Sequence, residues 1–135
     1  MAENIRLEVV TPEKSVVSES AQIVMAPGSL GEFGVLSGHT PFLTTLKTGA
    51  LKYKDENGNE RFVFISSGFA EALPDRVTVL AESAERRSKI DLARAKAAAE
   101  RAEKRLSSKD PDTDFVRAKA ALLRAISRLQ LLEGV

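Results

Sequence analysis

The character of the chain changes near Ala84, and this break constrains the fold more than any single motif does. Residues 1–84 carry seven Lys and Arg against eleven Asp and Glu, a net charge of −4, whereas residues 85–135 carry thirteen against eight, a net charge of +5. All glycines except Gly134, and all aromatic residues except Phe115, lie before the break. Because these shifts coincide, we expect two domains, residues 1–84 and residues 85–135.

The first region shows the pattern of short β-strands. Ile5, Leu7 and Val9 alternate with polar residues, which is the period of a half-buried strand. Further short β-branched and aromatic runs follow up to Leu80, separated by turn residues at close spacing. Many short strands of this kind indicate an antiparallel β-sandwich or barrel.

One turn in this region has a specific signal. Residues 55–59 separate two alternating apolar runs and contain the pair Asn57-Gly58. This pair is typical of a type I′ hairpin turn, in which both central residues adopt a positive φ. We therefore expect an antiparallel strand pair joined at this point.

The second region predicts two helices. An alanine-rich helix is expected from about Ile90 to Leu106, and a second helix after Pro111, capped by Asp112 or Thr113. The short connection implies an antiparallel hairpin. The inward faces expected from helical spacing are Ala93, Ala97, Ala98, Ala102 and Leu106 in the first helix, and Phe115, Ala118, Leu122, Ala125, Ile126 and Leu129 in the second.

The alanine face of the hairpin suggests how firmly it is held. Alanine removes little apolar area from water, so this face should dock weakly on any partner. Weak docking suits an element that moves, since a modest ligand energy can then shift its population. The alternative is a close-packed, alanine-lined helix pair that stays in place.

The residue types argue against catalysis and against a metal site. The chain contains no cysteine, and its single histidine, His39, lies in a Gly-Pro loop without a nucleophile motif. No group of Asp, Glu and His has metal-ligand spacing. We therefore expect no catalytic residues, no metal and no required cofactor. The sequence also shows no signal peptide and no apolar run of membrane-spanning length, so we expect a reducing compartment.

Four arginines form the most suggestive charged set. Arg94 and Arg101 are seven residues apart on the first helix, and Arg124 and Arg128 are four apart on the second. In a closed hairpin these two pairs could converge on one anion, and guanidinium groups suit phosphate because they donate forked hydrogen bonds. The competing interpretation is a solvated helix face with ion pairs inside each helix.

Three segments of the chain resemble the epsilon subunit of F-type ATP synthases. Residues 26–42 read APGSLGEFGVLSGHTPF and are similar to the signature loop of that family, with Ser37 in place of the usual proline. Residues 68–81 resemble its strand pair, and residues 84–95 match the start of its C-terminal domain. The resemblance covers nearly the whole chain in the right order.

This resemblance implies a ten-stranded β-sandwich followed by a two-helix hairpin, in a subunit without an active site. The sandwich would dock on the central rotor stalk against the gamma subunit and the c-ring, with His39 facing gamma and Glu32 near the ring. The hairpin would regulate: folded down it leaves catalysis free, and extended it meets the alpha and beta subunits and inhibits ATP hydrolysis. The location implied is peripheral, on the cytoplasmic face of the inner membrane, without insertion into the bilayer.

Some members of the family bind ATP in the folded-down hairpin. Their motif, Ile/Leu-Asp-x-x-Arg-Ala, is matched here by residues 90–95. ATP would act as a regulatory ligand that is not hydrolysed, and whether magnesium accompanies it stays open. The residues implied for this site are Glu85, Ile90, Asp91, Arg94, Ala95, Arg101, Arg124 and Arg128.

Two other classes of function fit parts of the sequence. A nucleic-acid binder could use the basic hairpin, but that half offers only Phe115 for base stacking, so we expect no nucleic-acid partner. A stand-alone β-module with a helical hairpin could serve as an interaction adaptor, although its helices are too short for several heptads.

Overall fold

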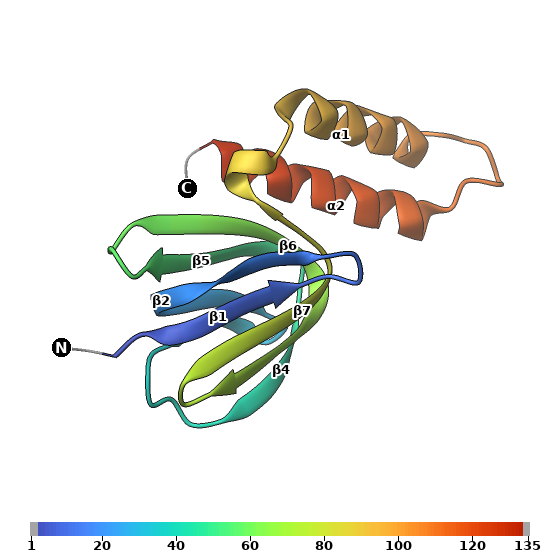
Figure 1. The fold of residues 1–135 in the computed structure, drawn as a ribbon. Helices are drawn as coiled ribbons and strands as arrows, with labels where there is room; N and C mark the ends of the chain where they lie inside the picture. The colour runs from blue at the N-terminus through green and yellow to red at the C-terminus, as the bar shows by residue number, and fades with distance from the viewer. Residues whose placement is uncertain (1–2, 134–135) are drawn as a thin grey trace. The chain divides into compact units, whose positions relative to one another are not determined.

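The structure, a computed structural model, describes residues 3–133 and forms two compact units that divide between Arg86 and Arg87 (Figure 1). We call the first the sheet unit and the second the hairpin unit. The sheet unit contains β1 (Ile5–Val10), β2 (Ser15–Gly28), β3 (Gly31–Val35), β4 (Phe42–Leu46), β5 (Gly49–Asp55), β6 (Glu60–Leu73) and β7 (Arg76–Arg86). The hairpin unit contains a short 3-10 turn, η1 (Arg87–Lys89), then α1 (Leu92–Leu106) and α2 (Phe115–Leu132).

The strands close on themselves around one core. β1 pairs with β2 and β7, β2 pairs with β5, β5 with β6, and β6 with β7, while β3 and β4 extend the sheet from β2 and β6. Within residues 3–133, every pairing is antiparallel except that of β1 with β7, which is parallel. The expected sandwich is confirmed, with one parallel pair added.

The described residues form seven strands rather than about ten, because two of the strands are long and bent. β6 pairs with β5 through residues 60–65 and with β4 through residues 68–72. Between the two halves, Ser67 and Gly68 both adopt positive φ, of 53° and 141°. A local break of this kind lets one strand turn the corner between two layers.

At Gly68 the backbones of β6 and β7 approach each other closely. A Cβ placed there would lie 2.0 Å from the carbonyl oxygen of Leu80, so no side chain fits. Glycine is therefore required at this corner by both the contact and the backbone conformation.

The turn between β5 and β6 differs from the sequence prediction. Among residues 55–59 only Gly58 has a positive φ, of 81°, and Asn57 does not, so the prediction of a type I′ turn is wrong. The Asp55 carboxylate instead accepts hydrogen bonds from the backbone N–H groups of Asn57 and Asn59, each at 2.9 Å. The Asp55 side chain thus stabilises a longer loop that the pair Asn57-Gly58 alone does not reveal.

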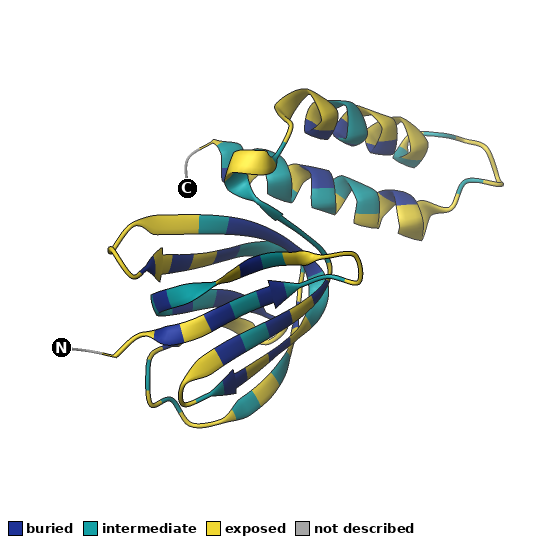
Figure 2. Cartoon of the chain, in the orientation of Figure 1, coloured by how far each residue is buried: buried dark blue, intermediate teal, exposed yellow. Residues whose placement is uncertain are grey.

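The core of the sheet unit consists of large apolar side chains. The alternation predicted for Ile5, Leu7 and Val9 is confirmed, since each is at most 1% exposed. Tyr53 is the largest side chain of this core. Figure 2 shows the resulting alternation of buried and exposed residues along the strands.

The hairpin unit packs through alanines. Ala95, Ala99 and Ala102 of α1 and Ala118 and Ala125 of α2 are buried, together with Leu131. The inward face predicted for α1 was therefore rotated: Ala102 is correct, but Ala93 is exposed and Ala95 and Ala99 take the inner positions. Spacings of four and three residues among alanines fit several faces equally well, so the pattern did not decide between them.

Both helices begin at an aspartate. The Asp91 carboxylate accepts a hydrogen bond from the N–H of Arg94 at 3.1 Å, and the Asp114 carboxylate accepts one from the N–H of Arg117 at 3.0 Å. The second N-cap is therefore Asp114, and the prediction of Asp112 or Thr113 was wrong by one or two residues. Asp112 and Thr113 lie instead in the connection between the helices.

Candidate functional site

The open end of the hairpin carries Asp91, Arg94 and Ala95, three of the residues predicted to bind ATP. Asp91 is the N-cap of α1, and its hydrogen bond to the Arg94 backbone places the two residues together at the first turn. Both side chains are exposed. Arg94 also lies directly before Ala95, which is 4% exposed and packs at the interface of the two helices. The motif therefore joins a helix start, an exposed cation and a buried packing residue.

The other predicted cations lie on both helices. Arg101 of α1 is exposed, whereas Arg124 and Arg128 of α2 are half-buried. Because the helices are antiparallel, the start of α1 lies level with the C-terminal half of α2, which carries Arg124 and Arg128. Within residues 3–133, the structure pairs none of Arg94, Arg101 and Arg124 with a carboxylate.

Two predicted residues lie before α1. Ile90 is half-buried and follows η1, with its N–H donating to the carbonyl of Arg87 at 3.2 Å. Glu85 belongs to the sheet unit, where it pairs with Phe64 of β6 near the end of β7. The predicted set is therefore drawn from both units.

One hollow on the hairpin lies away from this end. It is an open depression at the closed end, where α1 leads to α2, and is lined by Arg105, Asp112, Thr113, Asp114, Arg117 and Ala118. Asp91 and Arg94 lie at the opposite end of α1. This hollow therefore does not coincide with the predicted ATP-binding residues.

In the sheet unit, His39 lies in an ordered loop between β3 and β4. Its ring contacts Phe42 edge-on at a centroid distance of 5.0 Å, and Phe42 in turn contacts Phe33 at 5.1 Å. The N–H of Gly38 donates to the carbonyl of Pro74 at 2.7 Å, which ties the loop to the turn before β7. His39 is half-buried, and this packing holds the loop in a defined shape.

The sheet unit also exposes an apolar patch that the sequence prediction did not identify. Leu43 is 71% exposed, Phe69 53% and Leu80 54%. Phe69 lies opposite Leu80 on the neighbouring strand, and Leu43 lies opposite Glu71, so three strands contribute to one outer face. Together with Glu71 and Thr78 they line a shallow hollow, which we call the outer patch. Its signal in the sequence was weak, since an apolar residue on either face of a strand looks the same.

Glu32, the other predicted interface residue, is exposed on β3. This strand pairs only with β2 among the described residues, so Glu32 lies at an edge of the sheet. It faces Pro27 across the pairing. The position leaves its carboxylate accessible to a partner.

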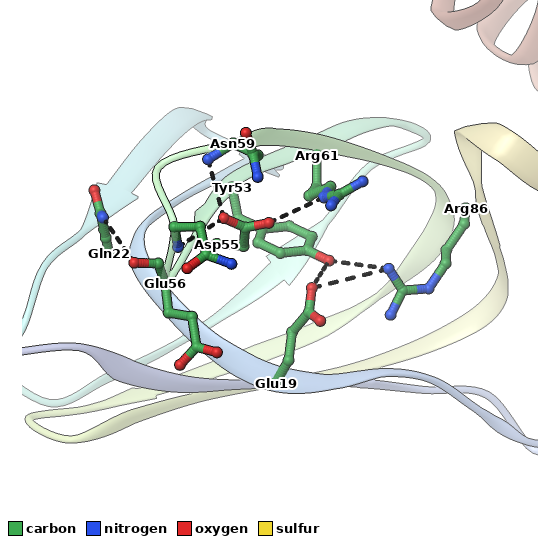
Figure 3. Close-up of polar contacts among 9 residues, drawn as sticks. Glu19, Gln22, Tyr53, Asp55, Glu56, Asn59, Arg61 and Arg86 are labelled. Atoms are coloured by element: carbon green, nitrogen blue, oxygen red, sulfur yellow. Dashed lines mark hydrogen bonds and ion pairs between the residues drawn. The ribbon is translucent and has the colours of Figure 1, made fainter.

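A polar cluster lies where β7 ends (Figure 3). The buried Tyr53 hydroxyl donates a hydrogen bond to the Glu19 carboxylate, and Arg86 donates one to the same hydroxyl at 3.1 Å. Burial, reinforced by the bond to Glu19, raises the pKa of Tyr53 to about 12, while Arg86 acts in the opposite direction. The phenol is therefore protonated at neutral pH and serves as a hydrogen-bond donor.

Neither a metal centre nor a membrane span is found in the described part of the chain. Residues 3–133 contain no cluster of three or more Asp, Glu or His side chains able to hold a metal ion. No helix within the same residues is long and apolar enough to cross a bilayer.

Comparison with protein families and known proteins gives a consistent result. Residues 4–87 match the family described as ATP synthase, Delta/Epsilon chain, beta-sandwich domain, and residues 88–133 match the long alpha-helix domain of the same chain. An ATP synthase epsilon chain from Desulforapulum autotrophicum is 66% identical over 133 residues, covering 98% of both chains. One from Syntrophobacter fumaroxidans is 55% identical over the same length and coverage.

A solved structure shares the fold. A chain in the Euglena gracilis mitochondrial ATP synthase, in a structure of OSCP, F1 and the c-ring, superposes with a TM-score of 0.82 at 24% identity, covering 96% of this chain and 81% of that one. At this identity the likeness supports the arrangement of strands and helices.

Proposed function

The chain belongs to the epsilon-chain family of bacterial F-type ATP synthases, and from this membership we propose that it acts as a rotor subunit with a fixed part and a regulatory part. It is a subunit of the synthase and not an enzyme in itself. The fixed part is the sheet unit, which docks on the gamma subunit and the c-ring. The regulatory part is the hairpin, and the whole subunit is held at the cytoplasmic face of the membrane through its partners.

Docking on gamma is supported by the outer patch. Leu43, Phe69 and Leu80 leave apolar surface in contact with water, and a patch of this kind with a polar margin is typical of a protein interface. The ordered His39 loop precedes β4, the strand that carries Leu43, so it extends the same docking region. At the sheet edge, Glu32 is available to polar loops of the c-ring.

The docking proposal is tested by capture of purified gamma subunit. Leu43→Ser combined with Leu80→Ser should lower the affinity for gamma at least tenfold, because each removes apolar area from the patch. The control is Leu30→Ser, since Leu30 is 102% exposed in the turn between β2 and β3, outside the patch. Equal capture of the wild type and the double variant would refute docking through this patch.

Regulation is proposed to depend on ATP binding at the open end of the hairpin. ATP would bring together the cations of α1 and α2, namely Arg94, Arg101, Arg124 and Arg128, and so favour the folded-down state. Ligand at 100 times its dissociation constant stabilises the bound state by about 2.7 kcal/mol. The observation that carries this proposal is that, within residues 3–133, Arg94, Arg101 and Arg124 have no carboxylate partner.

Calorimetric titration of ATP into the full chain tests the ligand. Arg94→Ala should abolish or strongly weaken the binding heat, whereas Lys96→Ala, two residues further along α1, should leave it unchanged. Both side chains are exposed and basic, so the pair separates a specific site from general charge. If the wild type gives no heat at millimolar ATP, the proposed ligand is wrong.

Inhibition of hydrolysis is proposed for the extended hairpin. Its net charge of +5 suits acidic segments of the alpha and beta subunits. Synthase assembled with a chain ending at Arg86 should hydrolyse ATP faster than synthase assembled with the full chain. Raising the ATP concentration should bring the two rates closer together. Equal hydrolysis rates under all conditions would contradict the inhibitory role.

A further inference from the structure

The second half of β7 pairs with fewer strands than its first half. β1 pairs with residues 76–80 of β7, whereas β6 pairs with the strand as far as Arg86. In the described residues, the segment 81–86 therefore has a single neighbouring strand. It leads directly into η1 and the hairpin. A strand end with one neighbour opens readily, and a moving hairpin would pull on it.

The side chain of Arg86 takes over the support that β1 does not provide. Its Nε donates a hydrogen bond to the carbonyl oxygen of Val16 at 3.0 Å, and its terminal nitrogen donates to the Tyr53 hydroxyl at 3.1 Å. The same nitrogen lies 3.9 Å from the Glu19 carboxylate. Arg86 therefore connects the end of β7 to two other strands, β2 and β5, as Figure 3 shows for Tyr53 and Glu19.

A bulge in β2 makes the Val16 carbonyl available. The pairing of β1 and β2 runs from Val9 opposite Val17 to Val10 opposite Ser15, and so passes over Val16. The extra residue of such a bulge is left out of the ladder. Its carbonyl can therefore accept the hydrogen bond from Arg86, which lies 70 residues away in the sequence.

Tyr53 is the anchor of this cluster. It is fully buried in the core of the sheet unit, and its hydroxyl contacts both Glu19 and Arg86. The side chain of Arg86 is 34% exposed, so it lies at the surface but is held from the inside. A planar guanidinium reaches several acceptors at fixed angles, which a lysine ammonium does not.

We propose that Glu19, Tyr53 and Arg86 form an exit clamp that ends the rigid sheet unit at Arg86 and sets the pivot of the hairpin at residues 87–90. The boundary between the two units, between Arg86 and Arg87, coincides with the clamped residue. If residues 81–86 detached from the sheet, the hairpin would be tethered by a flexible segment up to about 20 Å long, at roughly 3.3 Å per extended residue. The hairpin would then no longer turn about a fixed point. The role in regulation depends on the proposed mobility of the hairpin.

Hydrogen exchange of the full chain tests the clamp itself. Tyr53→Phe removes only the hydroxyl, and Arg86→Met removes the guanidinium while keeping an unbranched apolar side chain. Both should speed exchange of residues 81–86 at least tenfold while leaving β1 and β5 protected. The matched control is Arg61→Met, because Arg61 pairs with Asp55 in the same sheet, 3.2 Å apart, away from the exit. Wild-type exchange of residues 81–86 in both clamp variants would overturn the proposal.

A distance measurement tests the pivot. The chain contains no cysteine, so spin labels can be attached at Glu56→Cys in the sheet unit and Lys109→Cys in the hairpin, both exposed positions. The clamp variants should broaden the distance distribution, and Arg86→Lys should broaden it less than Arg86→Met. An unchanged width in the clamp variants would overturn the pivot. Because no ATP and no partner subunit are present, failure of the regulatory function leaves this result unaffected.

Discussion

The sheet unit and the hairpin unit bury side chains of very different size. The sheet unit encloses Tyr53, Leu51, Leu7 and other large apolar residues, whereas the helices meet through five alanines and Leu131. A buried Leu, Val or Phe contributes about 1.5–3 kcal/mol, but a single methyl group contributes about 0.8 kcal/mol. We therefore expect the hairpin unit to open at a lower cost in free energy than the sheet unit, as its proposed regulatory role requires.

The largest loss of stability is expected at Gly68, where the backbone of β7 leaves no space for a side chain. Gly68→Ala should destabilise the sheet unit by about 5 kcal/mol, because the added Cβ collides with the Leu80 carbonyl and the residue must keep a φ of 141°. Urea unfolding measures the change. Gly38→Ala is the control, since Gly38 also has a positive φ but nothing lies within 4 Å of a Cβ there, and about 1 kcal/mol is expected. Equal losses in the two variants would show that the close contact does not matter.

A cavity in the sheet core should be the next largest effect. Leu51→Ala removes a fully buried side chain and should cost about 3 kcal/mol. Because the core cluster contains residues of the sheet unit only, hydrogen exchange of α1 and α2 should change little. If both units lost protection from exchange together, the two units would not unfold independently, and the contrast between them would be wrong.

The hairpin should respond to added volume instead. Ala99→Leu places a large side chain between closely packed helices and should cost about 2 kcal/mol, so that α1 and α2 separate. Exchange of residues 92–132 should rise while the sheet unit stays protected. Ala93→Leu is the matched control on the exposed side of the same helix and should leave exchange unchanged. An Ala99→Leu hairpin that stays closed would mean that its packing is looser than the structure indicates.

The two N-caps separate helix stability from ligand binding. Asp91→Ala and Asp114→Ala should each cost about 1 kcal/mol by leaving a helix-end N–H without its acceptor. Asparagine caps a helix nearly as well, so Asp91→Asn should restore the start of α1. Calorimetry then shows whether ATP binding depends on the N-cap hydrogen bond or on the negative charge of the side chain. Loss of binding in Asp91→Asn but not in Asp114→Asn would assign Asp91 to the ligand site.

The smallest effect is expected on the pH dependence of stability, through Asp55 in the turn between β5 and β6. The N–H of Asn59, and then Arg61 and the N–H of Asn57, hold the pKa of Asp55 below its usual value of 3.8 against the opposing effect of burial. Because the folded pKa is lowered, this contribution is complete above about pH 4 and is lost as the pH falls further. The unfolding midpoint of Asp55→Asn should therefore depend less on pH below 4 than that of the wild type. Parallel pH profiles would contradict the assignment.

Local sequence patterns predicted the elements well where neighbours in the chain decide them. The alternation from Ile5 to Val9 placed β1, and the alanine-rich run ending at Leu106 placed α1. The errors lie where several local solutions have similar energy. An Asn-Gly pair fits more than one turn, three consecutive residues near position 113 can cap a helix, and alanines at mixed spacing fit several helix faces.

The sequence by itself determined that this chain has two unlike parts, because glycine, aromatic residues, alanine and net charge are distributed unevenly on either side of residue 84. It also determined the family through motifs that run along the chain. Only the tertiary structure decided that Leu43, Phe69 and Leu80 form one outer patch and that Arg86 reaches Val16 and Tyr53. These groups come from strands far apart in the sequence, and their proximity depends on register, on a bulge and on a bent strand, none of which a local pattern encodes.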